Sequence, residues 1–170
     1  MKTDSSTFVD NNEQVARILH QEWVVDGEMQ ANAFALTVGE TYLSVNRLSV
    51  NTFYSDVRDF VSKHPAYRAS EKFDSCYLAT LNVGEIRSME VSFREKVANL
   101  TVEVEPRDVH YKSHAGIFTR IEGKNIKGGQ NAEIMNDEGH VVSYEAILLK
   151  VQHHLLALAE LEKYKVISEQ

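Results

Sequence analysis

The chain has 170 residues, of which 43% are hydrophobic, 25% charged and 9% aromatic, and it contains 2 prolines. These proportions suit one globular domain, and they exclude collagen-like, low-complexity and wholly disordered proteins. With 18 Lys and Arg against 25 Asp and Glu, the formal net charge is −7. A protein that binds nucleic acid nonspecifically depends on a basic surface, so the overall charge argues against that class.

Cysteine content and apolar runs bear on the compartment. Cys76 is the only cysteine in the sequence, so the chain can form neither an intrachain disulfide nor a cysteine-based metal site. The polar N-terminus lacks the apolar segment of a secretory signal, and no stretch approaches the roughly 18 consecutive apolar residues of a membrane span. We therefore expect a cytoplasmic protein that does not contact a membrane.

The N-terminal segment predicts a tail followed by a helix. Residues 1–9 form the expected loose tail, whereas residues 10–170 contain no linker and form a single domain. Val15, Ile18 and Leu19 recur at helical spacing, so we expect the first helix here.

A strand and a second helix are predicted next. Residues 42–50 are rich in β-branched and partly alternating apolar side chains, which is typical of a strand. From about 52 to 63, apolar residues recur at helical spacing. Thr52 is available to cap the start of this helix, and Pro65 stands where it must end.

The middle of the chain predicts sheet, and its end predicts a helix. Residues 77–83, 100–105 and 115–121 have the pattern of strands, while the glycines of residues 122–140 indicate loops or hairpins. Apolar residues at helical spacing over about 143–165 predict a long amphipathic helix. Helices at both ends of a run of strands are typical of an α+β domain, here with a mostly antiparallel sheet.

The C-terminal helix carries the strongest indication of a partner. Leu149 and Leu156 fall outside its main apolar arc and form a second leucine stripe. Either the same domain or a second molecule covers that stripe. The leading functional prediction is therefore a non-enzymatic interaction protein or accessory subunit, acting through a protein partner or as a homo-oligomer.

Three polar residues support an alternative, a small enzyme or a ligand-binding domain for an anionic or nucleotide-like compound. Arg47 shares a strand face with Leu43 and Val45, where a charge must be paired. Either an internal carboxylate, which the sequence favours, or an anionic ligand would satisfy it. In the second case Arg47 would hold the anion, His114 would act as general acid or base, and Ser44 would assist by hydrogen bonding.

The sequence contains no G-x-S-x-G, Walker A or G-x-G-x-x-G motif. His110 and His114 are four residues apart, a spacing at which two imidazoles on a helix can share a metal. Their surroundings indicate an extended chain, in which residues four apart lie about 13 Å from each other. We therefore predict neither a metal nor a cofactor.

The segment 107–127 is locally basic. It holds five basic residues against Asp108 and Glu122, a net charge of +3, which leaves −10 for the rest of the chain. Such a segment could bind phosphate, RNA or an acidic protein surface, or it could be a solvated loop. The candidate anion-binding or partner-binding residues are Arg107, Lys112, Arg120, Lys124 and Lys127.

Several short motifs occur in an order that resembles a family of small, uncharacterised bacterial proteins. They are W-x-x-D-G at Trp23, A-F at Ala33, L-S-V-x-R at Leu43, E-I-R at Glu85, V-x-x-E-P at Val102 and H-A-x-I at His114. The resemblance covers about residues 18–121 and implies no activity. The resemblance does imply that Trp23, Ser44 and Arg47 belong to one spatial arrangement. His114 belongs to the same arrangement, so we expect it to lie close to Arg47.

Overall fold

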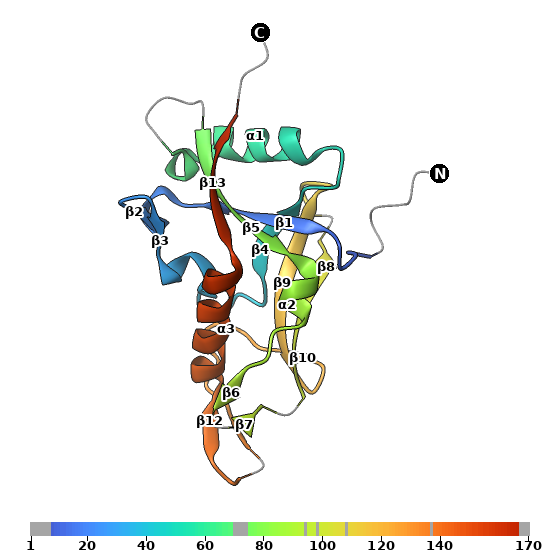
Figure 1. Ribbon diagram of the computed structural model, residues 1–170, viewed down its shortest axis with the longest axis vertical. Helices are drawn as coiled ribbons and strands as arrows, with labels where there is room; N and C mark the ends of the chain where they lie inside the picture. Colours follow the sequence, from blue (N-terminus) through green and yellow to red (C-terminus); the bar gives the residue numbers. More distant parts are fainter. Residues whose placement is uncertain are drawn as a thin grey trace.

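A seven-stranded antiparallel sheet organises the part of the chain that the computed structural model describes, residues 8–69, 75–93, 95–97, 99–107, 109–136 and 138–166 (Figure 1). Helices pack on both faces of the sheet, so the α+β class with a mostly antiparallel sheet is confirmed. The strands are β1 (Gln14–Leu19), β4 (Leu43–Arg47), β5 (Ser75–Asn82), β8 (Leu100–Pro106), β9 (His114–Ile121), β10 (Lys124–Asn125) and β13 (Glu160–Lys165). The helices are α1 (Phe53–Lys63), α2 (Val83–Arg87) and α3 (Tyr144–Leu158).

Short elements occupy the connections. Small antiparallel pairs join β2 (Val24–Val25) to β3 (Glu28–Met29), β6 (Ser92–Phe93) to β7 (Glu95–Lys96), and β11 (Glu133–Met135) to β12 (Val141–Ser143). The 3₁₀ turns are η1 (Gln21–Trp23), η2 (Ala31–Phe34) and η3 (Pro65–Tyr67).

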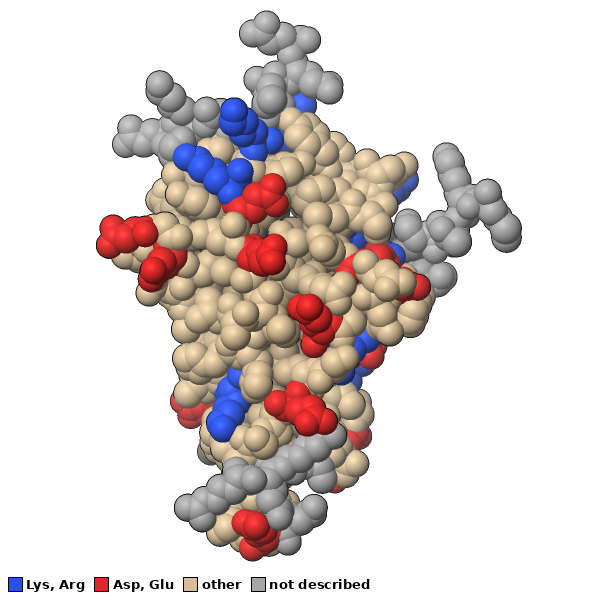
Figure 2. Space-filling model, viewed as in Figure 1, with Lys and Arg blue, Asp and Glu red and all other residues tan. Residues whose placement is uncertain are grey.

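Two apolar clusters cover the two faces of the sheet. On one face, Phe53 and Val57 of α1 pack with Ile18 of β1. On the other face, Val15 and Leu19 of β1 belong to a larger cluster that includes side chains of α2, α3 and η2. Figure 2 shows the side that carries α3 and β13, where charged side chains are scattered among uncharged ones. The core therefore lies on both sides of the central strand β1.

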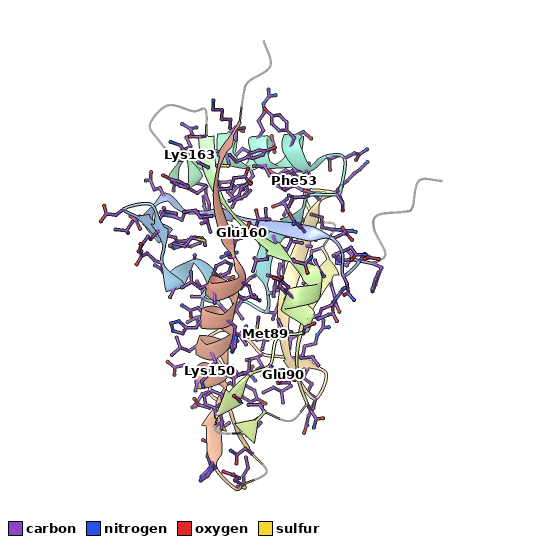
Figure 3. All side chains as sticks on the ribbon, in the orientation of Figure 1. Phe53, Met89, Glu90, Lys150, Glu160 and Lys163 are labelled. Carbon is purple, nitrogen blue, oxygen red and sulfur yellow. The ribbon has the colours of Figure 1, made fainter. Side chains whose placement is uncertain are left out.

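The order of the strands leaves β8 and β13 at the two edges. β9 pairs with β8 along one side and with β4 and β10 along the other. From β4 the sheet continues through β1 and β5 to β13. Glu160 and Lys163 lie along β13, and Glu162 and Lys165 are also exposed there (Figure 3). Charged side chains on an edge strand oppose pairing with another chain, so β13 is protected against edge-to-edge aggregation.

The helix expected at Val15, Ile18 and Leu19 is wrong, because this segment is the strand β1. β1 lies between β4 and β5, and both of its faces are covered. A strand buried on both faces has no alternation of apolar and polar residues, so its apolar run resembles that of a helix. Val9, which the prediction placed in the tail, is fully buried, while residues 1–7 lie outside the described residues.

The prediction of a long helix over about 143–165 is also wrong in its second half. α3 is a 15-residue helix without a clear amphipathic pattern, and it ends at Leu158. Ala159 is extended, with φ −77° and ψ 142°, and the chain continues as β13 against β5. Leu161 and Tyr164 are three residues apart, so they imitate helical spacing although they lie on a strand. No helix in the described ranges is long and apolar enough to cross a membrane.

The helix predicted over about 52–63 is confirmed as α1, and the strands predicted in the middle of the chain correspond to β5, β8 and β9. Thr52 is the N-cap residue directly before α1, but its hydroxyl does not cap a helix amide. It donates instead to Asp56 Oδ2 at 2.9 Å. Thr52 thus helps to hold a buried carboxylate.

Candidate functional site

A pocket of about 680 Å³ opens where β1 and β4 separate. The ladder between these strands has two residue pairs, Val15 with Arg47 and Ala16 with Asn46. Beyond Ala16, β1 continues beside β5 and β4 continues beside β9, so the two strands no longer pair. The volume is in the range of small-molecule sites. The pocket is lined by Arg17, Ile18, Trp23, Asn32, Ala35, Thr37, Glu40, Tyr42, Ser44, Asn46, Phe60, Tyr67, Val109, His110, Tyr111 and His114.

A second hollow of about 610 Å³ lies beside β12 and the start of α3. Phe93, Asn136 and Val142 contribute to its lining, and no described residue of that lining is both charged and buried. Perturbed or buried ionisable groups are concentrated at functional sites, and a pocket that contains one is the better candidate. The pocket between β1 and β4 is therefore the candidate site.

Arg17 is the buried charge of this pocket, with 9% of the residue exposed. Its Nε donates to Ala33 O at 2.6 Å, and its Nη1 donates to Ser44 O at 3.0 Å. The guanidinium also lies over the Trp23 ring, 5.2 Å from the centroid. No carboxylate of the described residues forms an ion pair with Arg17. Both hydrogen-bond acceptors of this cation are thus uncharged carbonyl groups.

The free part of the Arg17 guanidinium faces the pocket. Burial lowers the pKa of Arg17 to about 10. Tyr67 and the Glu40 carboxylate, which forms no ion pair with Arg17, favour the charged form. The guanidinium is therefore cationic at pH 7. Nη2 has no acceptor among the described residues, yet it is not a buried unpaired atom. It is therefore accessible from the pocket. An anionic ligand would complete this arrangement.

Two groups of aromatic rings line the pocket. In the first, the centroids of Trp23 and Tyr67 are 6.0 Å apart, and Phe60 of α1 lies 5.0 Å from Tyr67. In the second, the Tyr42 ring lies 6.0 Å from the His114 ring. Such rings offer surfaces on which a flat apolar or aromatic group can pack. The pocket thus combines one buried cation with aromatic walls.

Ser44 and His114 meet at the pocket, as residues of the neighbouring strands β4 and β9. The register pairs Ser44 with Gly116 and Asn46 with His114, so these side chains share one face. His114 Nε2 lies 3.3 Å from Ser44 Oγ, and its Nδ1 lies 3.2 Å from Val109 O. A carbonyl oxygen can only accept, so Nδ1 carries the proton and Nε2 accepts from the Ser44 hydroxyl.

This environment makes His114 a pH-dependent contributor to stability. Burial lowers the pKa of His114 below 6.5, and the charges of Arg107 and His110 lower it further, against the opposing hydrogen bond to Val109. The unfolded chain therefore binds this proton at a higher pH than the native protein does. The free energy of unfolding is expected to fall as the pH drops below 6.5, until the native pKa is passed.

Urea unfolding of the wild type and of His114→Gln at about pH 7.5 and about pH 5.5 measures this contribution. His114→Gln has no titratable group at position 114, so this variant should lose less stability on acidification than the wild type. All other titrating groups are common to the two proteins. An equal loss in both would contradict the assignment.

Arg47 does not line the pocket and lies on the opposite face of β4 from Ser44, so it does not meet His114. Its Nε and Nη2 donate to the two carboxylate oxygens of Glu13, each at 2.9 Å. Nη2 also donates to Phe8 O at 3.0 Å. Of the two partners that the sequence left open for Arg47, an internal carboxylate or an anionic ligand, the structure shows the internal carboxylate.

The cations of the basic segment do not gather in one place. Arg107 and Lys112 precede β9, whereas Lys124 and Lys127 follow it. An eight-residue strand separates the two pairs, which is roughly 25 Å of chain. The net charge of +3 is therefore local in the sequence and spread out in space.

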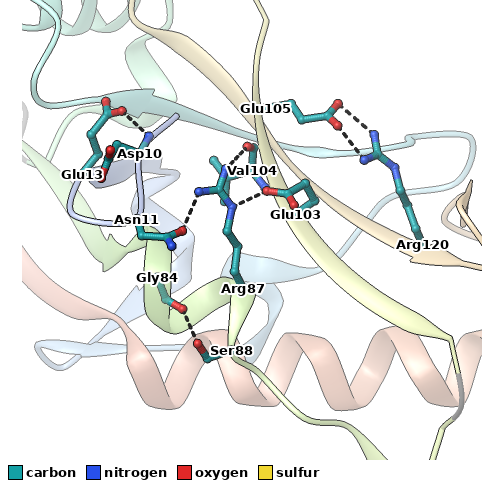
Figure 4. A network of polar contacts seen from close by, with 10 residues as sticks. All are labelled: Asp10, Asn11, Glu13, Gly84, Arg87, Ser88, Glu103, Val104, Glu105 and Arg120. Atoms are coloured by element: carbon teal, nitrogen blue, oxygen red, sulfur yellow. Dashed lines mark hydrogen bonds and ion pairs between the residues drawn. The ribbon is translucent and has the colours of Figure 1, made fainter. Parts of the chain in front are cut away.

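Two of the five cations also have protein partners. Arg120 forms a two-point ion pair with Glu105, with Nη1–Oε1 at 2.6 Å and Nη2–Oε2 at 2.8 Å (Figure 4). This pairing raises the pKa of Arg120, and Nε donates to Asn125 Oδ1 at 2.7 Å. Arg107 is exposed, but its guanidinium lies over the Tyr42 ring, 4.9 Å from the centroid. Arg107 thus supports a wall of the pocket.

The two leucines of the predicted second stripe have different surroundings. Leu149 is 51% exposed, whereas Leu156 is partly buried and packs against the large core cluster. The face that carries α3 shows no concentrated charge that would attract an oppositely charged partner (Figure 2). Leu149 alone remains as an exposed leucine of that pair.

The sequence interpretation missed Arg17 and Asn46. Arg17 is the lone charge in the apolar run from Val15 to Leu19, and this signal was available once the run is assigned to a strand. Asn46 offers no comparable signal. His110 and His114 both line the pocket, and no group of three or more His, Cys, Asp or Glu side chains able to hold a metal occurs among the described residues.

Comparisons with protein-family models, curated proteins and solved structures found no match. The short motifs that resemble a bacterial family therefore assign no family. A fold alone does not define a function, so the function must be argued from the pocket itself.

Proposed function

We propose that the protein binds a small organic anion that carries a flat apolar or aromatic group. The anionic group pairs with Arg17, and the flat group packs among Trp23, Phe60 and Tyr67. One observation carries the proposal: Arg17, a residue that is 9% exposed, lines this pocket while its protein acceptors are neutral carbonyls. Charge-assisted hydrogen bonds in such a poorly hydrated site are stronger than those in water.

This proposal keeps the ligand-binding alternative from the sequence and replaces Arg47 with Arg17. Ser44 and His114 remain part of the site, as a neutral hydrogen-bonded pair beside the ligand. Docking of a protein partner on α3 is the weaker proposal, because Leu156 packs within the domain. Binding of RNA or an acidic partner by residues 107–127 is also weaker, because its cations lie far apart.

Benzoate and its neutral counterpart benzamide test the proposal. Trp23 is the single tryptophan of the chain and lines the pocket, so its fluorescence reports occupancy. In the wild type, benzoate should bind about tenfold or more tightly than benzamide, because only benzoate pairs with Arg17. In Arg17→Gln this preference should disappear. Equal binding of the two compounds to the wild type would overturn the proposal.

Two further variants control this experiment. Lys124→Gln removes an exposed cation outside the pocket and should leave the preference for benzoate unchanged. Glu40→Gln removes a negative charge that acts on Arg17, so it should raise the affinity for benzoate. Because Glu40 is exposed, this variant tests the same electrostatics even if Arg17→Gln does not fold. Unchanged or weaker benzoate binding in Glu40→Gln would count against the proposal.

A further inference from the structure

A chain of hydrogen bonds runs from a buried carboxylate toward the pocket. Asp56 of α1 is 9% exposed, and its Oδ2 accepts from the Thr52 hydroxyl at 2.9 Å. The same oxygen accepts from the backbone N of Ser113 at 3.0 Å and from Ser113 Oγ at 2.6 Å. The hydroxyl proton of the fully buried Ser113 is therefore committed to Asp56. Ser113 Oγ can then only accept further hydrogen bonds.

This arrangement sets the orientation of the Asn46 amide. Asn46 Nδ2 donates to Ser113 Oγ at 2.8 Å. The opposite orientation would place the amide oxygen against Ser113 Oγ, which has no second proton to donate. The amide nitrogen must therefore face Ser113. Asp56, acting through Ser113, thus fixes the Asn46 amide with its oxygen Oδ1 directed away from Ser113.

The other end of that amide is open to the pocket. Asn46 lines the pocket and is 9% exposed. Its Oδ1 has no donor among the described residues, and it is not one of the buried unpaired atoms. A hydrogen-bond acceptor of fixed orientation is thus available to whatever occupies the pocket. An occupant without a donor would desolvate this oxygen and leave it unpaired.

We propose that Asn46 selects ligands that carry an N–H or O–H donor in addition to the anionic group held by Arg17. This inference rests on the proposed function, because Arg17 supplies the first contact. Arg17 and Asn46 both line the same pocket of about 680 Å³. One small molecule can therefore reach both groups. The ligand class is a hydroxylated or amino-substituted aromatic acid.

The probes are meta- and para-hydroxybenzoate, the two corresponding methoxybenzoates, and benzoate, followed by Trp23 fluorescence. A methoxy group retains the oxygen but has no proton to donate. In the wild type, at least one hydroxybenzoate should bind about tenfold more tightly than benzoate and than its methoxy counterpart. In Asn46→Ala this advantage should fall below about twofold, because no acceptor remains at this position for the hydroxyl proton of the ligand.

Two other variants separate the donor contact from general effects on the pocket. Asn12→Ala removes an exposed asparagine outside the pocket and should keep the hydroxybenzoate advantage. Ser113→Ala leaves Asn46 in place but removes the acceptor that orients its amide, so the advantage should shrink. Ser113→Ala therefore tests the inference even if Asn46→Ala does not fold.

The outcomes distinguish this inference from the proposed function. If benzoate itself does not bind the wild type, the proposed function fails. If benzoate binds but neither hydroxybenzoate binds more tightly, the inference about Asn46 is overturned and the anion site stands. Survival of the advantage in Asn46→Ala would overturn the inference in the same way.

Discussion

Replacing Glu13 with alanine is expected to lower the free energy of unfolding by about 3–5 kcal/mol, because it breaks a buried ion pair with Arg47. The side chains of Glu13 and Arg47 are 12% and 4% exposed, and two hydrogen bonds of 2.9 Å join them. Glu13 also accepts from the backbone N of Asp10 at 2.7 Å and from the Ser49 hydroxyl (Figure 4 shows the contact with Asp10). Urea denaturation monitored by Trp23 fluorescence measures the loss.

The contacts of Glu13 also lower the pKa of its carboxyl group. Burial by itself would raise its pKa, but the hydrogen bonds from Arg47 and Ser49 outweigh burial and hold the pKa below the ordinary 4.5. A carboxyl group with a lowered native pKa stabilises the fold above its unfolded pKa. That contribution is lost as the pH falls through the native pKa. Glu13 thus acts as a charged cross-link at neutral pH.

Two comparisons make the Glu13→Ala result specific. Glu160→Ala, on the exposed edge strand β13, should change stability by less than about 0.5 kcal/mol. The double replacement Glu13→Leu with Arg47→Met removes both charges together and should recover most of the stability. A loss below about 1 kcal/mol for Glu13→Ala would show that this ion pair is not what stabilises the packing of β1 against β4.

Gly128→Ala is expected to cost about 2–5 kcal/mol, because a methyl group there collides with backbone. A Cβ on Gly128 would lie 2.0 Å from Thr37 O and 2.7 Å from Leu36 O. Gly128 also donates from N to Glu40 O and accepts at O from Gly39 N, both at 2.9 Å. Carbonyl groups cannot rotate away as a flexible side chain can. The segment that supplies Thr37 and Glu40 to the pocket must therefore move.

Gly27→Ala is the matched control for this substitution. Gly27 has φ +79° with no atom within 4 Å of an added Cβ, so alanine there meets conformational strain without a collision. That strain costs about 1–2 kcal/mol. Thermal or urea unfolding should therefore rank Gly128→Ala as the more damaging change. The reverse order would mean that the contact between Gly128 and residues 36–40 contributes little.

Helix α1 and strand β8, which each have one wet face, could be predicted from their own residues. α1 buries Phe53, Val57 and Val61 on one side, and the edge strand β8 alternates buried Val102 and Val104 with more exposed residues. Such periodicity is visible within a single segment. β1 and β13 were misassigned for two different reasons. β1 is covered on both faces, and the six pairs that define β13 are made with β5, a segment distant in the sequence.

The candidate site could be predicted only in part. Ser44 and His114 were both identified, and they lie 3.3 Å apart at the pocket. Arg47 does not line the pocket, because residues 44 and 47 of one strand point to opposite faces. Arg17 could not be placed, since its position depends on where the ladder between β1 and β4 ends. That point is a property of two strands together.

The sequence by itself determined the α+β class, the net charge of −7, and the requirement that a buried Arg47 be paired. The tertiary structure decided that Glu13 pairs it, that Arg17 faces the pocket instead, and that Gly128 supports the pocket wall. Local periodicity records which side of one element is buried. Pairing, register and contacts between loops join segments far apart in the chain, and no single segment contains that information.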